Sequence, residues 1–166
     1  MQQRIHELFD LLADGGLDAA DLDAMATEVD QAAADAETYL AADAASGYPA
    51  FKAQLGEAAM PLWQWVLLEQ LEGGLVFRGH TAVELYAEIV DAFGEDELEL
   101  APDALAGLDE AGAWQQVSAA LAPAYTPVDF AQAIDARRQI VLVRSAKLDR
   151  FLALSREIGL TAHPAV

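Results

Sequence analysis

Residues 139–160, "QIVLVRSAKLDRFLALSREIGL", contain the clearest strand and helix pattern in the chain. The aliphatic and β-branched run at 139–143 predicts a strand that is covered on both faces and is therefore central in its sheet. Ser145 is placed to cap the helix that follows, and Gly159 to end it. The apolar positions that recur at helical spacing are Leu148, Phe151, Leu152 and Ile158. The stretch is thus predicted to be a strand followed directly by a helix.

A second stretch, "LVFRGHTAVEL" at residues 75–85, has the same order of strand, arginine, cap and helix. Thr81 with Glu84 three residues later forms a capping-box pattern. If the two strands run parallel, both arginines and both helix N-termini lie at one edge of the sheet, where open α/β folds tend to bind ligands. A phosphate or carboxylate would suit such an edge. The candidate ligand-binding residues are Arg78, His80, Thr81, Arg144, Ser145 and Lys147. The alternative, which we favour, is that the arginines pair with the chain's own acids and that the caps are ordinary.

The remaining apolar periodicity predicts a helix-rich α+β or α/β fold in a single globular domain over residues 1–166. About five to six helices are expected to pack on a small sheet of three to four strands, with 139–143 as the central strand. One long helix is expected from Asp18 or Asp21 to about residue 46. Other helices are expected at 5–13, 59–72, 81–94 and around 114–121, with a loop at 95–110, an irregular segment or edge strand at 124–135, and a short strand at 160–163.

Charge is distributed very unevenly along the chain. The protein has 28 acidic and nine basic residues and a net charge of −19; residues 1–136 hold 26 acids and three bases, whereas residues 137–166 hold six bases and two acids. Such a field repels nucleic acid and anionic membranes and attracts basic partners. We therefore expect no nucleic-acid or membrane partner and a basic protein as the partner, with the protein itself a monomer or a homodimer.

The long helix expected after Asp18 carries acids without any basic residue, because the sequence has no Lys or Arg between Arg4 and Lys52. These acids need solvent, counterions or a basic surface. The predicted partner-binding face consists of Asp23, Glu28, Asp30, Asp35 and Glu37. One alternative is that the basic C-terminal segment docks on this helix, within one molecule or across a dimer.

Several chemistries find no support in the sequence. There is no cysteine, which excludes disulfides and thiolate sites, and the three histidines form no metal-binding motif. We expect no metal and no cofactor. The N-terminus lacks a secretory signal pattern, and the longest apolar run is shorter than a membrane span. A soluble protein of the cytoplasm is expected.

The segments "PLWQWVLLEQLEGGLVF" and "IVLVRSAKLDRFLALSREIGL" resemble a family of uncharacterised bacterial proteins of unknown function, over about half of the chain. The resemblance implies no activity. The sequence therefore favours a non-enzymatic acidic interaction protein of a regulatory, inhibitor or immunity type. The alternative is a small anionic-ligand binder or enzyme that uses the two strand-to-helix junctions at 78–81 and 144–147.

Overall fold

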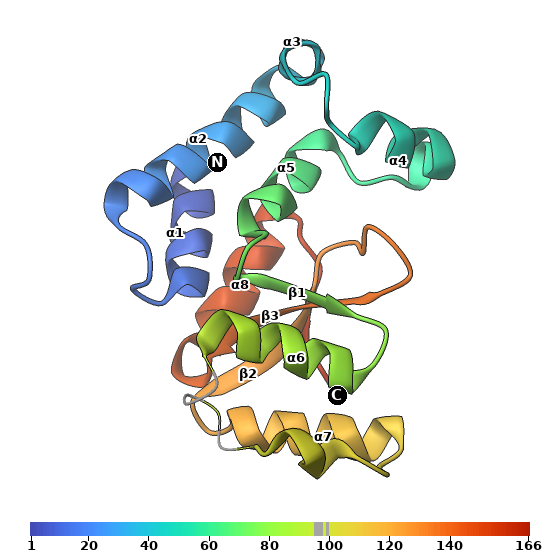
Figure 1. Ribbon diagram of the computed structural model, residues 1–166. Helices are drawn as coiled ribbons and strands as arrows, with labels where there is room; N and C mark the ends of the chain where they lie inside the picture. The colour runs from blue at the N-terminus through green and yellow to red at the C-terminus, as the bar shows by residue number, and fades with distance from the viewer. Residues whose placement is uncertain (95–97, 99) are drawn as a thin grey trace. The chain divides into compact units, whose positions relative to one another are not determined.

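The computed structural model describes residues 1–94, 98 and 100–166, and these contain eight α-helices and four β-strands (Figure 1). The chain divides into two compact units, Met1–Leu71 and Glu72–Val166. The first unit is helical, and the second contains the sheet. The expectation of a single globular domain stays a prediction.

The first unit consists of five α-helices and a short 3-10 turn. Helix α2 packs against both α1 and α5, and apolar residues on one face of α1 and α2, such as Phe9 and Val29, are fully buried. The helices are α1 (Gln2–Ala13), α2 (Ala19–Ala34), α3 (Ala36–Ala42), α4 (Tyr48–Leu55) and α5 (Leu62–Leu71), and the 3-10 turn is η1 (Gly56–Ala58). Tyr48 and Phe51 of α4 pack against Trp65 of α5, with ring centroids 5.9 and 5.0 Å away. The tryptophan that the sequence places in a buried helix thus joins α4 to α5.

The long helix expected from residue 18 to residue 46 is wrong, because it is two helices separated at Asp35. The backbone of Asp35 leaves helical geometry, and its carboxylate accepts hydrogen bonds from the N–H and the hydroxyl of Thr38 at 3.1 and 2.7 Å. An aspartate that bonds to nearby backbone N–H groups caps a new helix in preference to continuing the old one. Helix α4 was also missed, so the expected count of five to six helices is too low.

The second unit is built on a four-stranded sheet of order β1-β3-β2-β4 in which every neighbouring pair is antiparallel. The strands are β1 (Val76–Gly79), β2 (Tyr125–Phe130), β3 (Arg138–Arg144) and β4 (Ala162–Pro164). The other elements are α6 (Ala82–Phe93), η3 (Pro102–Leu105), α7 (Glu110–Leu121), η4 (Ser145–Lys147) and α8 (Leu148–Ile158). The unit is therefore α+β, and β3 lies inside the sheet as predicted.

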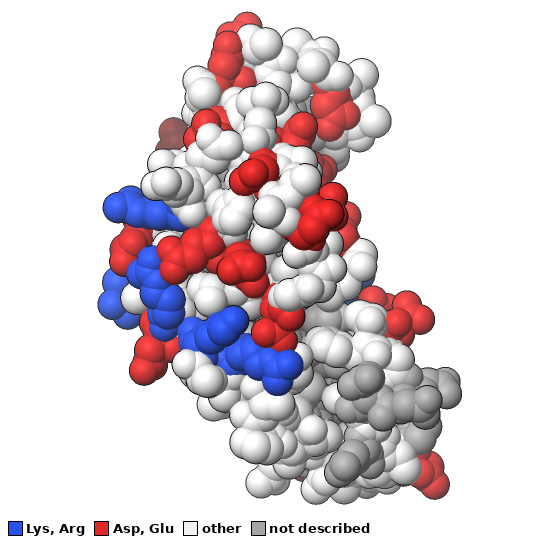
Figure 2. All heavy atoms as spheres, turned by 90° about the vertical axis from the view of Figure 1, so that its left-hand side faces the viewer, with Lys and Arg blue, Asp and Glu red and all other residues white. Residues whose placement is uncertain are grey.

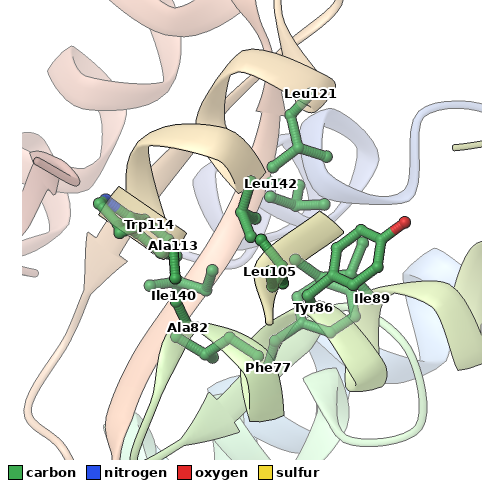
Figure 3. Close-up of a cluster of buried hydrophobic side chains, with 12 residues drawn as sticks. Phe77, Ala82, Tyr86, Ile89, Leu105, Ala113, Trp114, Leu121, Ile140 and Leu142 are labelled. Atoms are coloured by element: carbon green, nitrogen blue, oxygen red, sulfur yellow. The ribbon is translucent and has the colours of Figure 1, made fainter. Parts of the chain in front are cut away.

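Helices cover both faces of this sheet. On one face Phe77, Ile140 and Leu142 join buried residues of α6 and α7 in a hydrophobic cluster (Figure 3). Side chains alternate along a strand, so the neighbouring residues of β3 point to the opposite face. That face carries Phe130, whose ring lies 5.6 Å from the ring of Phe151 on α8. Among the described residues of this unit, the α-helices that pack on the sheet are α6, α7 and α8, fewer than the five to six expected from the sequence.

Two other segments, at 124–135 and 95–110, differ from the sequence-based expectation or are described only in part. Strand β2 is an interior strand, although Pro127 favoured an irregular segment or an edge. The proline is tolerated because β4 pairs only with residues 128–130, and Pro127 contributes its carbonyl oxygen to the N–H of Ala165 at 2.8 Å. Of the loop expected at 95–110, residues 95–97 and 99 lie outside the described residues, and the turn η3 occupies part of the remainder.

Candidate functional site

The two strand-to-helix junctions lie at opposite ends of the sheet, because β1 and β3 are antiparallel. Arg78 is paired with Gln139 at the start of β3, whereas Arg144 is at its end, opposite Tyr125. Gln139 and Arg144 are five positions apart in an extended strand, which is a distance of about 17 Å. The six residues proposed as one anion site therefore do not converge, and the site that combines both junctions is wrong.

At the first junction, the N-terminus of α6 is occupied by the chain's own oxygens. Thr81 accepts a hydrogen bond from the N–H of Glu84 at 3.2 Å, and the Glu84 carboxylate accepts one from the N–H of His80 at 2.6 Å. The N–H of Ala82 donates to the carboxylate of Glu110 on α7 at 2.7 Å. The cap by Thr81 is confirmed, whereas the reciprocal bond of a capping box is replaced by one from the N–H of His80, the residue before the N-cap. Two carboxylates of the unit already take the position where an external anion would bind.

Arg78 is held by groups of its own unit. Its Nε donates to Oε1 of Gln139 at 2.9 Å, and its Nη1 lies 3.0 Å from Oε1 of Glu72. Its side chain is 10% exposed, and its Nη2 is buried without a hydrogen-bond partner among the described residues. Gln139 in turn donates to the carbonyl oxygens of Phe130 and Gln132 at 2.8 and 3.2 Å. Arg78 is thus part of a network that ties β1 and the start of β3 to the end of β2.

At the second junction, the sequence placed the helix start two residues too early. The turn η4 separates the strand from α8, and the hydroxyl of Ser145 lies 2.8 Å from that of Thr126. Ser145 therefore does not cap α8, whose N-cap residue is Lys147, without a side-chain cap hydrogen bond. The guanidinium of Arg144 stacks over the ring of Tyr125 at 4.5 Å. Lys147 is exposed. The end of α8 is as predicted, with Gly159 in the left-handed conformation.

Other basic residues of the C-terminal segment are paired inside the second unit. Arg138 contacts both carboxylate oxygens of Asp129, at 2.8 and 2.9 Å, and stacks over the ring of Trp114 at 4.4 Å. Arg137 contacts Asp135 at 2.7 Å, and its hydrogen bonds lower the pKa of the Asp135 carboxyl to about 2. The segment is therefore partly neutralised by the chain's own acids.

The first unit presents an acidic surface. It contains 13 acidic residues and two basic ones, and no Lys or Arg occurs in α2 or α3. No residue of α3 is buried. At the end of the molecule that is uppermost in Figure 2, Asp and Glu side chains are visible on this face without a Lys or Arg beside them. Helix α2 alone carries four acidic residues, Asp21, Asp23, Glu28 and Asp30, and α3 adds Glu37.

An open hollow of about 670 Å³ lies along α2 and α3. It is lined by Glu28, Gln31, Ala34, Asp35, Thr38, Tyr39, Ala42 and Asp43. Glu28 and Gln31 are three residues apart and Asp35 follows four residues later, so the three side chains lie on one face of α2 and its C-terminal end. At Asp35 this face continues into α3. None of the described residues that line the hollow is Lys or Arg. Three carboxylates therefore border one concave surface without a basic residue among them.

Tyr39 gives this hollow an aromatic wall with a fixed position. Its hydroxyl donates to Oε2 of Glu28 at 2.7 Å, a bond that joins α3 to α2. Partial burial, and then this hydrogen bond and the nearby carboxylates, raise the pKa of Tyr39 well above its usual range. The hydrogen bonds from Thr38 lower the pKa of Asp35. At neutral pH the hollow thus combines a charged Asp35 with a neutral phenol.

The structure brings together only two of the five predicted partner-binding acids. Glu28 and Asp35 line the hollow, whereas Asp23 lies 3.2 Å from Nε2 of His6 on α1. Asp30 and Glu37 are not among the lining residues. Sequence reasoning missed Tyr39 and Asp43, although their spacing of four and eight residues from Asp35 would place them on the face of Glu28 and Asp35 in a continuous helix as well. The cap pattern of Asp35 with Thr38 three residues later was the signal that could have revealed the break.

In the described parts of the chain, no group of three or more His, Asp and Glu side chains is arranged to hold a metal ion. None of the described helices is both long and apolar enough to cross a membrane. Comparisons with protein-family models, curated proteins and solved structures gave no match. The resemblance to uncharacterised bacterial proteins stays a prediction.

Proposed function

We propose that the protein is a non-enzymatic interaction protein that uses the α2–α3 surface to bind a basic region of a partner protein. The observation that carries the proposal is the hollow bordered by Glu28, Asp35 and Asp43 with no basic residue in its lining. A regulatory, inhibitor or immunity-type protein fits this description. Its location in the cytoplasm and its bacterial origin remain expectations from the sequence.

The chemistry of the hollow suits the side chain of a lysine or an arginine. Carboxylates pair with either cation, and the ring of Tyr39 offers a face for a cation–π contact worth about 0.5–1 kcal/mol at an exposed site. Exposed ion pairs contribute only about 0.2–1 kcal/mol each, so one pair cannot hold a partner. Affinity must come from several such contacts made together.

The charge of the first unit acts at longer range than these contacts. An excess of 11 negative charges in residues 1–71 steers a basic partner toward the unit and speeds association, more strongly at low salt. The screening length is about 8 Å at physiological ionic strength, so contacts in the hollow persist there while steering weakens. Binding that depends on the hollow should therefore survive at physiological salt.

A direct test uses a variant that removes charge without removing structure. Asp35→Asn keeps an N-cap of nearly equal quality, Glu28→Gln keeps an acceptor for Tyr39, and Asp43→Asn removes the third charge. The probe is a fluorescently labelled oligo-arginine peptide, whose binding is followed by anisotropy at low salt and at about 0.15 M ionic strength. We expect the triple variant to bind the probe at least tenfold more weakly than the wild type at the higher salt.

The matched control removes three charges elsewhere in the same unit, with Asp10→Asn, Asp21→Asn and Glu57→Gln at exposed positions outside the hollow. Both triple variants have the same net charge. If both lose affinity equally, the field of the unit and not the hollow binds the probe, and the proposed site is wrong. If neither the probe nor any basic protein binds the wild type at either salt, the proposed function is wrong as well.

A further inference from the structure

We draw no further inference here: the strongest candidate, the buried indole nitrogen of Trp114 and hydroxyl of Ser118 one turn apart on α7, has no hydrogen-bond partner among the described residues, but apart from the Arg138 guanidinium over the Trp114 ring nothing in the structure shows what faces either atom.

Discussion

Replacing Gln139 by leucine tests whether Arg78 has a structural role or belongs to a ligand site. The side chain of Gln139 is 4% exposed and makes hydrogen bonds to Arg78, Phe130 and Gln132. Leucine has a similar size but can neither accept from the guanidinium nor donate to the two carbonyl oxygens. The substitution should therefore loosen the junction of β1, β2 and β3.

The expected cost follows from the groups left without a partner. The carbonyl oxygen of Phe130 is buried, and the guanidinium of Arg78 is mostly buried, whereas the carbonyl of Gln132 can turn to water. Each buried group that loses its partner costs about 1–3 kcal/mol. Burial of the leucine side chain offsets about 1.5–3 kcal/mol of this. We expect a net loss of about 2 kcal/mol.

Hydrogen exchange of the β3 amides is the suitable assay, because it reports on this sheet separately from the helical unit. A loss of about 2 kcal/mol corresponds to an increase of about 30-fold in the exchange rate. Gln115→Leu, at an exposed position of α7, is the matched control and should change exchange by less than about threefold. Equal exchange in the two variants would show that Gln139 does not hold the sheet.

Combining Gln139→Leu with Arg78→Met should cost less stability than the sum of both single changes, because they remove the same hydrogen bond. Strict additivity of the two free-energy changes would refute the network.

Three further outcomes are expected. Because the folded state raises the pKa of Tyr39, the stability from its hydrogen bond is complete below about pH 10 and is lost as the pH rises through the folded-state value. Burial also raises the pKa of Tyr86, so an ultraviolet titration should show late tyrosinate transitions of both residues, and Tyr39→Phe should lose one of them. Thr81→Ala should lower the free energy of unfolding by about 1 kcal/mol in urea titrations, whereas an equal loss in Thr81→Asn would contradict its role as the N-cap of α6. Arg137→Gln should return the pKa of Asp135 from about 2 toward its ordinary value in an NMR titration, and an unchanged pKa would contradict the pairing. In the wild type this pair adds stability at neutral pH that is lost as the pH falls toward 2, and the variant should lack this contribution.

The sequence predicts best where one local signal decides the structure. The β-branched run before Arg144 identified an interior strand, and the Thr81–Glu84 pattern located the start of α6. Gly159 identified the end of α8 for the same reason, since its left-handed conformation is accessible to glycine at little cost. These features depend on residues a few positions apart, so tertiary structure did not alter them.

The sequence predicts the structure less well where a residue far away in the chain determines it. Strand direction depends on pairing between residues about 60 positions apart, and the antiparallel pairing of Arg78 with Gln139 could not be read from either junction alone. The acidic surface was predicted, but the break of its helix at Asp35 was not. Helical periodicity across an alanine-rich segment does not reveal such a break, because alanine favours helix on both sides of it.

Because the strands alternate in direction, the loops of the second unit lie at two opposite ends of the sheet, which we call its rims. One rim gathers the end of β1 with His80 and Thr81 and the loop at 131–137, because Gly79 pairs with Arg138. The other gathers the segment at 122–124 with Ser145, whose N–H donates to Ala124. A binding loop grafted on one rim cannot borrow side chains from the other, so a library built on this scaffold should vary one rim and keep the other constant for stability.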